Sequence, residues 1–491
     1  MSSPHNHVVD LQAAATQAMR ARGFQAEFPP EVDRQLAELS AHPPTVAPSD
    51  GTRGIRDLRG LIWSSIDNDT SRDLDQLEVV EPLSGDQTKV LIAIADVDAF
   101  VPKHSPIDAH AALETTTVYT GVRNFPMLPE ALSTGATSLL EGADKLAMVI
   151  EFVLSTDGSV HAGTVYRAVV RNKAQLTYDA VGAWLEQRGP APPKVAASAD
   201  LQQQLRLQDA CAQRLLTARS QHGALDIETI ETHPIWLNGA IVDLARHQKN
   251  RATQLIEDFM IAGNEVVARA LDDVSSIRRV VKTPKRWDRI VGLAREAGAT
   301  LPVEPDSKAL NAFLLGRKQA DPDHFVDLSL AVIKLMGPGE YVLERPGDPQ
   351  DGHFGLAVQN YTHATAPNRR FADLVTQRLV KAVLSRQAPP YTDDELASIA
   401  NDCTVKEDAA RRVERDMSKR IAAVAMSGRI GDTFDAIVTG VTPKGTFVRI
   451  MQPHVEGLLA HGQEGLDVGD KLRVRLVRTD AQRGYIDFER L

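Results

Sequence analysis

The spacing of apolar residues predicts helices near the start of the chain. Two short amphipathic segments, residues 9–22 and 30–40, have helical periodicity. Pro30 suits a first helical turn, where its missing N–H group is not needed. Residues 42–51 are rich in helix breakers, which is typical of a linker. We therefore expect a small helical module over residues 1–52.

The pattern then changes to short apolar or alternating runs, which are typical of β-strands. These runs lie at residues 61–66, 77–80, 90–95, 148–154 and 160–170. The last two are joined by Ser155-Thr156-Asp157-Gly158, a sequence that favours a tight hairpin turn.

Helical periodicity returns in the middle of the chain, and strands return at its end. Helices are predicted over residues 178–187, 201–219, 253–271 and 367–385. After residue 430, five short strands with glycine turns indicate a small closed barrel. The predicted fold class is therefore multidomain α+β, with a mixed domain over residues 53–428 between the helical module and an all-β barrel over residues 429–491.

Composition narrows the class of protein only slightly. The 55 Lys and Arg against 65 Asp and Glu give a formal charge of −10, which argues weakly against a nucleic-acid partner. A basic channel in an acidic protein can still bind phosphate. No apolar run approaches the ~20 residues that cross a bilayer, and the start lacks the pattern of a signal peptide. We expect a cytoplasmic protein with no membrane partner.

A run of acidic residues follows the first strand and is the leading candidate for chemistry. Asp67, Asp69, Asp73 and Asp75 lie within nine residues. Residues two apart in an extended chain face the same way, so Asp73 and Asp75 can share a site. Converging carboxylates need a compensating cation, and Mg²⁺ prefers oxygen ligands, water and substrate phosphate. Spacing alone nevertheless favours the simpler interpretation of a solvated acidic turn.

A second motif, residues 361–373, changes that balance. Pro367 is expected to open a helix that carries Arg369 in its first turn. Free backbone N–H groups there, together with a guanidinium, would form an anion site. A surface ion pair between Arg369 and Asp373 explains the same residues. Together, an acidic metal cluster and an arginine anion site supply what phosphodiester hydrolysis needs.

With both motifs, the chain resembles the RNB family of exoribonucleases, of the ribonuclease II and ribonuclease R type, over about residues 58–426. The tail resembles an S1-type RNA-binding barrel of the OB class. Segments that match in order are residues 66–75, 94–97, 124–129, 257–264 and 361–371.

The resemblance implies an RNB catalytic domain of mixed sheets surrounded by helices. It also implies a 3′-to-5′ hydrolytic exoribonuclease, active in RNA decay and processing. Such an enzyme degrades single-stranded RNA processively to nucleoside 5′-monophosphates. Its cofactor would be Mg²⁺ or Mn²⁺, with no organic cofactor, and we expect a monomer.

The resemblance also assigns roles at the reacting phosphate. It implies that Asp67, Asp73 and Asp75 hold the metal and orient the attacking water, and that Arg369 contacts the scissile phosphate. Asp73, Asp75 and Arg369 are thus the catalytic candidates. Gln76 stands where the family's fourth aspartate is expected. An amide oxygen can ligate a metal but removes one negative charge, so metal affinity or preference is expected to differ.

Further roles concern the RNA itself. The resemblance places Tyr178 and Glu257 on the ribose, a contact that distinguishes RNA from DNA. It places Glu414 near the RNA 3′ end and Phe447 of the barrel on a base. Aromatic packing for Tyr178, a helix-surface ion pair for Glu414 and a core position for Phe447 remain open.

Two more departures from the family pattern stand out. Tyr119 aligns with one base-clamping aromatic residue, but Ile227 occupies the place of its phenylalanine partner and offers no π-face. The helical module stands where typical members carry two cold-shock domains, so RNA capture is expected to differ. Two rival functions remain: a catalytically weakened RNA-binding protein of the same type, and a DNA nuclease or phosphodiesterase.

Overall fold

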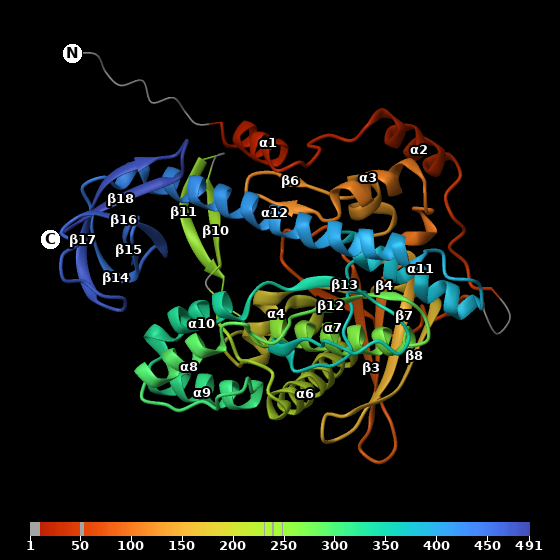
Figure 1. The fold of residues 1–491 in the computed structure, drawn as a ribbon. Coiled ribbons are helices and arrows are strands. Elements are labelled where there is room, and N and C mark those ends of the chain that lie inside the picture. Colours follow the sequence, from red (N-terminus) through yellow and green to blue (C-terminus); the bar gives the residue numbers. More distant parts are fainter. Residues whose placement is uncertain (1–9, 50–53, 230, 238–239, 248) are drawn as a thin grey trace.

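The computed structural model describes residues 10–49, 54–229, 231–237, 240–247 and 249–491. The predicted α+β class is confirmed: mixed sheets and helices form the body of the molecule, and an all-β barrel lies at one end (Figure 1). The expected helix start at Val9 and the last linker residues, Asp50 and Gly51, lie outside the described residues.

A seven-stranded sheet of order β1-β8-β7-β4-β3-β2-β9 forms the centre of the mixed domain. Only the two edge pairs, β1–β8 and β2–β9, are parallel. Leu154 pairs with Val160 across the predicted hairpin turn, which is confirmed. The strand bounds are β1 Arg56–Asp57, β2 Ser64–Asp67, β3 Gln76–Pro82, β4 Thr88–Ala95, β7 Asp144–Leu154, β8 Val160–Arg171 and β9 Ala174–Thr177.

Helix α7 (Arg251–Ala270) packs directly on this sheet. A Cβ atom at its Gly263 would lie 3.2 Å from Ile92 Cδ1, so a glycine allows the close approach. The apolar face predicted from periodicity, including Leu255 and Phe259, is buried there. Other helices around the sheet are α3 Pro106–Glu114, α4 Tyr178–Leu185, α5 Pro193–Ala196, α6 Ala199–His222 and α11 Phe371–Ser385.

The longest helix, α12 (Asp393–Met426), runs from the sheet region to the barrel (Figure 1). Its 34 residues span about 50 Å at the usual rise per residue. Near its middle, α12 packs against α1 (Leu11–Ala21), and α2 (Pro30–Ala41) packs against α3. The helical module therefore packs along the mixed domain, with Met19 and Met417 in one shared apolar cluster.

Three helices that periodicity did not predict form a separate group beside the barrel. They are α8 Trp287–Glu296, α9 Ser307–Ala320 and α10 Pro322–Met336. They enclose their own apolar core around Ile290, Leu310 and Phe325. Three short strand pairs lie outside the central sheet and the barrel. They are β5 Val118–Tyr119 with β6 Asn124–Phe125, β10 Glu231–Leu237 with β11 Ala240–His247, and β12 Ser276–Val280 with β13 Glu340–Glu344.

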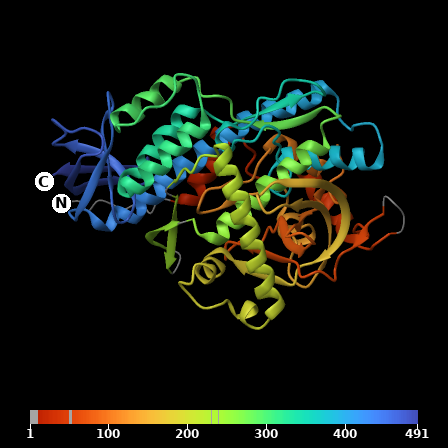
Figure 2. The same ribbon diagram turned by 90° about the horizontal axis from the view of Figure 1, so that it is seen from below.

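The predicted five-stranded barrel closes as expected. Its strands are β14 Thr433–Thr442, β15 Gly445–Ile450, β16 Val455–His461, β17 Lys471–Asp480 and β18 Tyr485–Arg490. Arg449 joins the barrel to α10 through a bidentate ion pair with Asp327, at 2.8 and 3.0 Å. Both views place the barrel beside the α8–α10 group, at the opposite end from the central sheet (Figures 1 and 2). Along the described ranges, no helix combines the length and apolar content that crossing a bilayer requires.

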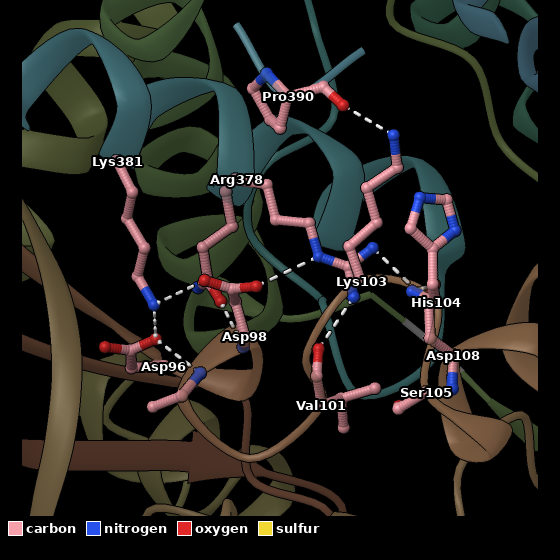
Figure 3. A network of polar contacts seen from close by, with 12 residues as sticks. Asp96, Asp98, Val101, Lys103, His104, Ser105, Asp108, Arg378, Lys381 and Pro390 are labelled. Carbon is pink, nitrogen blue, oxygen red and sulfur yellow. Dashed lines mark hydrogen bonds and ion pairs between the residues drawn. The ribbon is translucent and has the colours of Figure 1, made fainter. Parts of the chain in front are cut away.

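A buried network of charges fixes α11 against the sheet (Figure 3). Arg378 on α11 lies 2.9 Å from Asp98 and 2.7 Å from Asp108, and it also donates to Val101 O at 2.7 Å. Lys381, one turn further on, is paired with both Asp96 and Asp98. Since these aspartates follow β4 or lie on α3, the network sets the position of α11 and of the turn that precedes it.

Replacing Arg378 by methionine should destabilise the fold strongly. The side chain is 3% exposed, and its loss leaves the buried Asp108 carboxylate without its cation, at a cost of about 3–5 kcal/mol. Urea unfolding followed by circular dichroism measures this change. The control is Arg411→Met, which removes a half-exposed pair with Glu407 and should change stability by less than about 1 kcal/mol. Equal effects of the two substitutions would contradict the role of the network.

Candidate active site

The acidic run forms the loop between β2 and β3, and its members differ in exposure. Asp67 ends β2, and its Oδ1 accepts from Asn68 N at 2.7 Å and from Ser71 Oγ at 2.8 Å, which closes the turn. Asp69 is exposed, whereas Asp75 is only 1% exposed. A solvated turn therefore describes Asp69 but not Asp75.

Asp75 is where the two sequence motifs meet. Its Oδ1 accepts a hydrogen bond from the backbone N–H of Asn368 at 3.1 Å. The Nε of Arg369 lies 3.4 Å from Oδ2. That oxygen is buried and has no hydrogen-bond partner among the described residues. A buried carboxylate, one of whose oxygens accepts no hydrogen bond from the described residues and is open to a further ligand, thus lies beside a guanidinium.

The turn that carries Arg369 corrects one prediction. Helix α11 begins at Phe371, not at Pro367, so Arg369 lies before the helix. The N–H groups expected to be free are bonded elsewhere: Asn368 N donates to Asp75, and Phe371 N donates to Thr115 O at 2.8 Å. The predicted anion site at an open helix terminus is therefore wrong. The Asn368 N–H group, which an anion would have used, already donates to Asp75.

The expected alternative for Arg369 is wrong as well. Asp373 is paired with Arg370, through two hydrogen bonds of 2.7 Å. Asp373 also accepts from Ala366 N at 2.8 Å, which ties the turn to the first turn of α11. Arg369 is therefore left to face Asp75.

Tyr119 links the acidic loop to α12. Its hydroxyl donates to Asp73 Oδ2 at 3.0 Å, and its backbone N–H donates to Glu414 Oε1 at 3.1 Å. The Glu414 side chain therefore contacts a strand that reaches the acidic loop, a contact that the surface ion-pair interpretation does not provide.

Burial dominates the electrostatics of the carboxylates. It raises the pKa of Asp75 to about 7, although Arg369 and the Asn368 N–H group both favour the charged form. Burial also raises the pKa of Asp67, and the charge of Asp73 adds to this effect. The pKa of Glu78, on β3, lies well above its usual value, first because of burial and then because of Asp67. Such a set of carboxyls favours a compensating cation.

The residues fit a hard divalent cation that needs only one or two protein ligands. Within the described residues, no three His, Cys, Asp or Glu side chains are arranged as a ready ligand set. Mg²⁺, however, is usually bound through one or two carboxylates, with water and substrate phosphate completing its shell. The open Asp75 oxygen, with Asp67 and Asp73 close enough for their charges to interact, meets that requirement. Gln76, buried at the start of β3, is the adjacent residue.

A cavity of about 400 Å³ opens beside the loop. Tyr178, the first residue of α4, lines it together with Asn68, Asp69 and Thr177. Burial raises the pKa of Tyr178, and Asp67 and Glu78 raise it further. Glu257 on α7 is about one-third exposed, and its Oε2 accepts from Lys249 Nζ at 2.8 Å. Tyr178 thus lies at the acidic loop, whereas Glu257 has a local lysine partner.

The structure places the remaining predicted residues elsewhere. Ile227 packs against the apolar core of the α8–α10 group. Phe447 is partly buried on β15 of the barrel. Two residues that were not predicted, Asn368 and Glu78, lie at or beside the acidic loop. For Glu78 a signal was present, since it follows Gln76 by two residues on the same strand, but nothing local distinguishes Asn368.

Comparisons with known proteins agree with this architecture. The family model of the RNB domain matches residues 55–386, and that of the RNase II-type exonuclease C-terminal S1 domain matches residues 432–491. Ribonuclease R 1 of Lactococcus lactis is 29% identical over 95% of this chain and 59% of its own length. Ribonuclease R of Thermotoga maritima is 31% identical, over 94% of this chain and 68% of its own length.

A solved structure shows the same fold. Mycoplasma genitalium RNase R in complex with double-stranded RNA is 23% identical, with a TM-score of 0.83, over 98% of this chain and 83% of that one. This chain thus spans about 60% of the length of the Lactococcus relative.

The buried Asp75 predicts a pH-dependent stability when no divalent metal is present. The unfolded chain releases the Asp75 proton near pH 3.8, whereas the folded protein keeps it to about pH 7. This contribution to stability is complete below pH 3.8 and is lost as the pH rises to 7, by on the order of 4 kcal/mol. Asp75→Asn removes this titration. In EDTA, the stability of the variant relative to wild type should therefore increase between pH 4 and pH 8. A difference independent of pH in chemical unfolding would contradict this assignment.

Proposed function

This chain belongs to the RNB-domain family, and from that premise we propose that it is a metal-dependent 3′-to-5′ exoribonuclease. Its substrate would be single-stranded RNA, hydrolysed to nucleoside 5′-monophosphates. One observation carries the proposal: a buried carboxylate, Asp75, keeps an open oxygen beside Arg369. Relatives named Ribonuclease R support RNA as the substrate.

Each side chain at the site then has a definite task. A divalent cation held by Asp67, Asp73 and Asp75, with Gln76 adjacent, would supply a water of lowered pKa and positive charge. Arg369 would bind the scissile phosphate and stabilise the charge that develops on it. The Asn368 N–H group fixes one oxygen of Asp75 and so orients the other. Tyr119 fixes Asp73 through its hydroxyl, and Glu414 fixes the backbone of Tyr119.

Recognition of RNA would involve the ribose and the bases. Tyr178, which lines the cavity next to the loop, would contact a 2′-hydroxyl. Glu257 would have to exchange Lys249 for the ribose. Ile227 offers no π-face and packs among helices, so stacking on the 3′-terminal bases would rely on Tyr119. Phe447 and the basic residues of the barrel would hold RNA further upstream, weakly and with strong salt dependence.

A second candidate is an RNA-binding protein of the same family with weakened catalysis. The observation that favours it is Gln76, which carries no charge where a fourth aspartate is expected. A DNA nuclease remains the third alternative. Matched RNA and DNA oligomers distinguish it, since equal cleavage of both would contradict the ribose contacts assigned to Tyr178 and Glu257.

The central test is a time course with a 5′-labelled single-stranded RNA and Mg²⁺. We expect shortening from the 3′ end, release of mononucleotides and inhibition by EDTA. Asp75→Asn should reduce the rate by roughly a thousandfold or more while RNA affinity stays within about threefold. Asp86→Asn is the matched control, because this exposed aspartate lies beyond the other end of β3 from the acidic loop. Intact RNA despite a gel shift by the wild-type protein would favour the weakened RNA-binding protein instead.

Structured RNA provides a second test. The solved structure of the Mycoplasma genitalium relative is a complex with double-stranded RNA. We expect degradation to proceed into the stem of a hairpin that carries a short 3′ overhang. Denaturing gels measure where digestion ends, and a linear RNA of equal length is the control. Consistent arrest before the stem would show the expectation to be wrong.

A further inference from the structure

Glu78 is an unusual residue for its position in the sheet. It lies on β3, directly opposite Ser64 of β2 and Ile92 of β4. The residue is 0% exposed, and neither carboxylate oxygen has a hydrogen-bond partner in the part of the chain that the structure describes. Ser64 Oγ is buried without a partner as well. A carboxyl group thus occupies a core position in which none of the described residues gives it a hydrogen bond.

Such a group lowers the stability of the protein unless something else binds it. Burying an ionised carboxylate without a partner is strongly unfavourable, and even the neutral acid loses its hydrogen bonds to water. An apolar residue would suit the neighbouring Ile92 better. Residues that break the rules of packing without local compensation are concentrated at functional sites. The position of Glu78 relative to the acidic loop is therefore informative.

Glu78 lies on the same side of β3 as Gln76, because side chains two apart in a strand share a face. Its partner Ser64 is three residues before Asp67 on β2. Glu78 is close enough to Asp67 for the two charges to interact, and both interact with Tyr178. The Glu78 carboxyl thus lies toward the end of the sheet that carries Asp67, and it shares a face of the sheet with the neutral side chain of Gln76.

We propose that Glu78 supplies the negative charge that Gln76 lacks and binds the divalent cation together with Asp67. The inference rests on the proposed function, since it assumes that the acidic loop holds a metal. Two carboxylates are a sufficient protein contribution for Mg²⁺ or Mn²⁺ when water and phosphate fill the remaining positions. The acidic set of this chain is then shifted by two residues along β3 rather than diminished.

The test measures metal binding without RNA. Purified full-length protein, stripped with EDTA, is titrated with Mn²⁺, and free Mn²⁺ is followed by electron paramagnetic resonance. We expect Glu78→Gln to weaken Mn²⁺ binding at least tenfold and to raise the unfolding temperature in EDTA. The double variant Q76D/E78L, which moves the carboxylate back to position 76, should restore affinity to within about threefold. Glu81→Gln is the control, because Glu81 lies on the same strand but is partly exposed and paired with Lys89.

Each outcome separates this inference from the proposed function. Wild-type Mn²⁺ affinity in Glu78→Gln overturns the inference, whether or not the protein cleaves RNA. If Glu78→Gln loses Mn²⁺ binding but the wild-type protein never cleaves RNA, the inferred metal site stands and only the proposed function is contradicted. If Glu78→Gln does not fold, the folded Q76D/E78L variant decides. Mn²⁺ affinity near that of wild type supports the relocation of the charge, and affinity more than tenfold weaker contradicts it.

Discussion

The contact between Asp75 and Arg369 requires a buried carboxylate and a guanidinium to meet across 294 positions of sequence, at 3.4 Å. The charged form of Asp75 would be strongly unfavourable there alone, because its side chain is 1% exposed, whereas about half of the Arg369 side chain is exposed. Arg369 and the Asn368 N–H group only partly offset the burial of Asp75, whose pKa remains near 7. The nearby positive charge therefore does not fully stabilise the Asp75 carboxylate. A bound cation would add the missing positive charge and could bind a phosphate as well.

The surrounding structure holds this unfavourable arrangement in place. The ion pairs of Arg378 and Lys381 fix α11 to the loop after β4 and to α3. The turn before α11 is bonded at both ends, through Asp373 and through Thr115 O. On the other side, α12 presents Glu414 to Tyr119, which in turn contacts Asp73. Because the Arg378 side chain is buried and the turn before α11 is bonded through backbone groups, Arg369 has little freedom to move away from Asp75.

Asp75 and Glu78 also suggest a common relation between stability and activity. Both are buried carboxyls with oxygens that accept no hydrogen bond among the described residues, and both lower the stability of the metal-free protein. Under the proposed function, a bound cation would recover part of that free energy, so that metal binding and folding would be linked. The neutral Gln76 then need not imply an inactive enzyme, since the charge of the region depends on the whole strand.

The sequence by itself determined the main classes of element and the protein family. Periodicity predicted the main strands, α6, α7 and the five-stranded barrel, and the spacing of aspartates identified the loop that contains Asp75. The roles of the individual residues stay predictions. Periodicity missed α3, the α8–α10 group, α12 and the isolated strand pairs. The helices of the α8–α10 group bury their apolar faces mainly against one another.

The tertiary structure alone decided where α11 begins, which carboxylate faces Arg369 and how Tyr119 connects Asp73 to Glu414. These features depend on contacts between residues far apart in sequence, such as the bond from Asn368 N to Asp75 across 293 positions. Local patterns report only which conformation a segment prefers by itself. The same backbone N–H group can serve a helix terminus, an anion or a distant carboxylate, and only the packed fold determines which of these it meets.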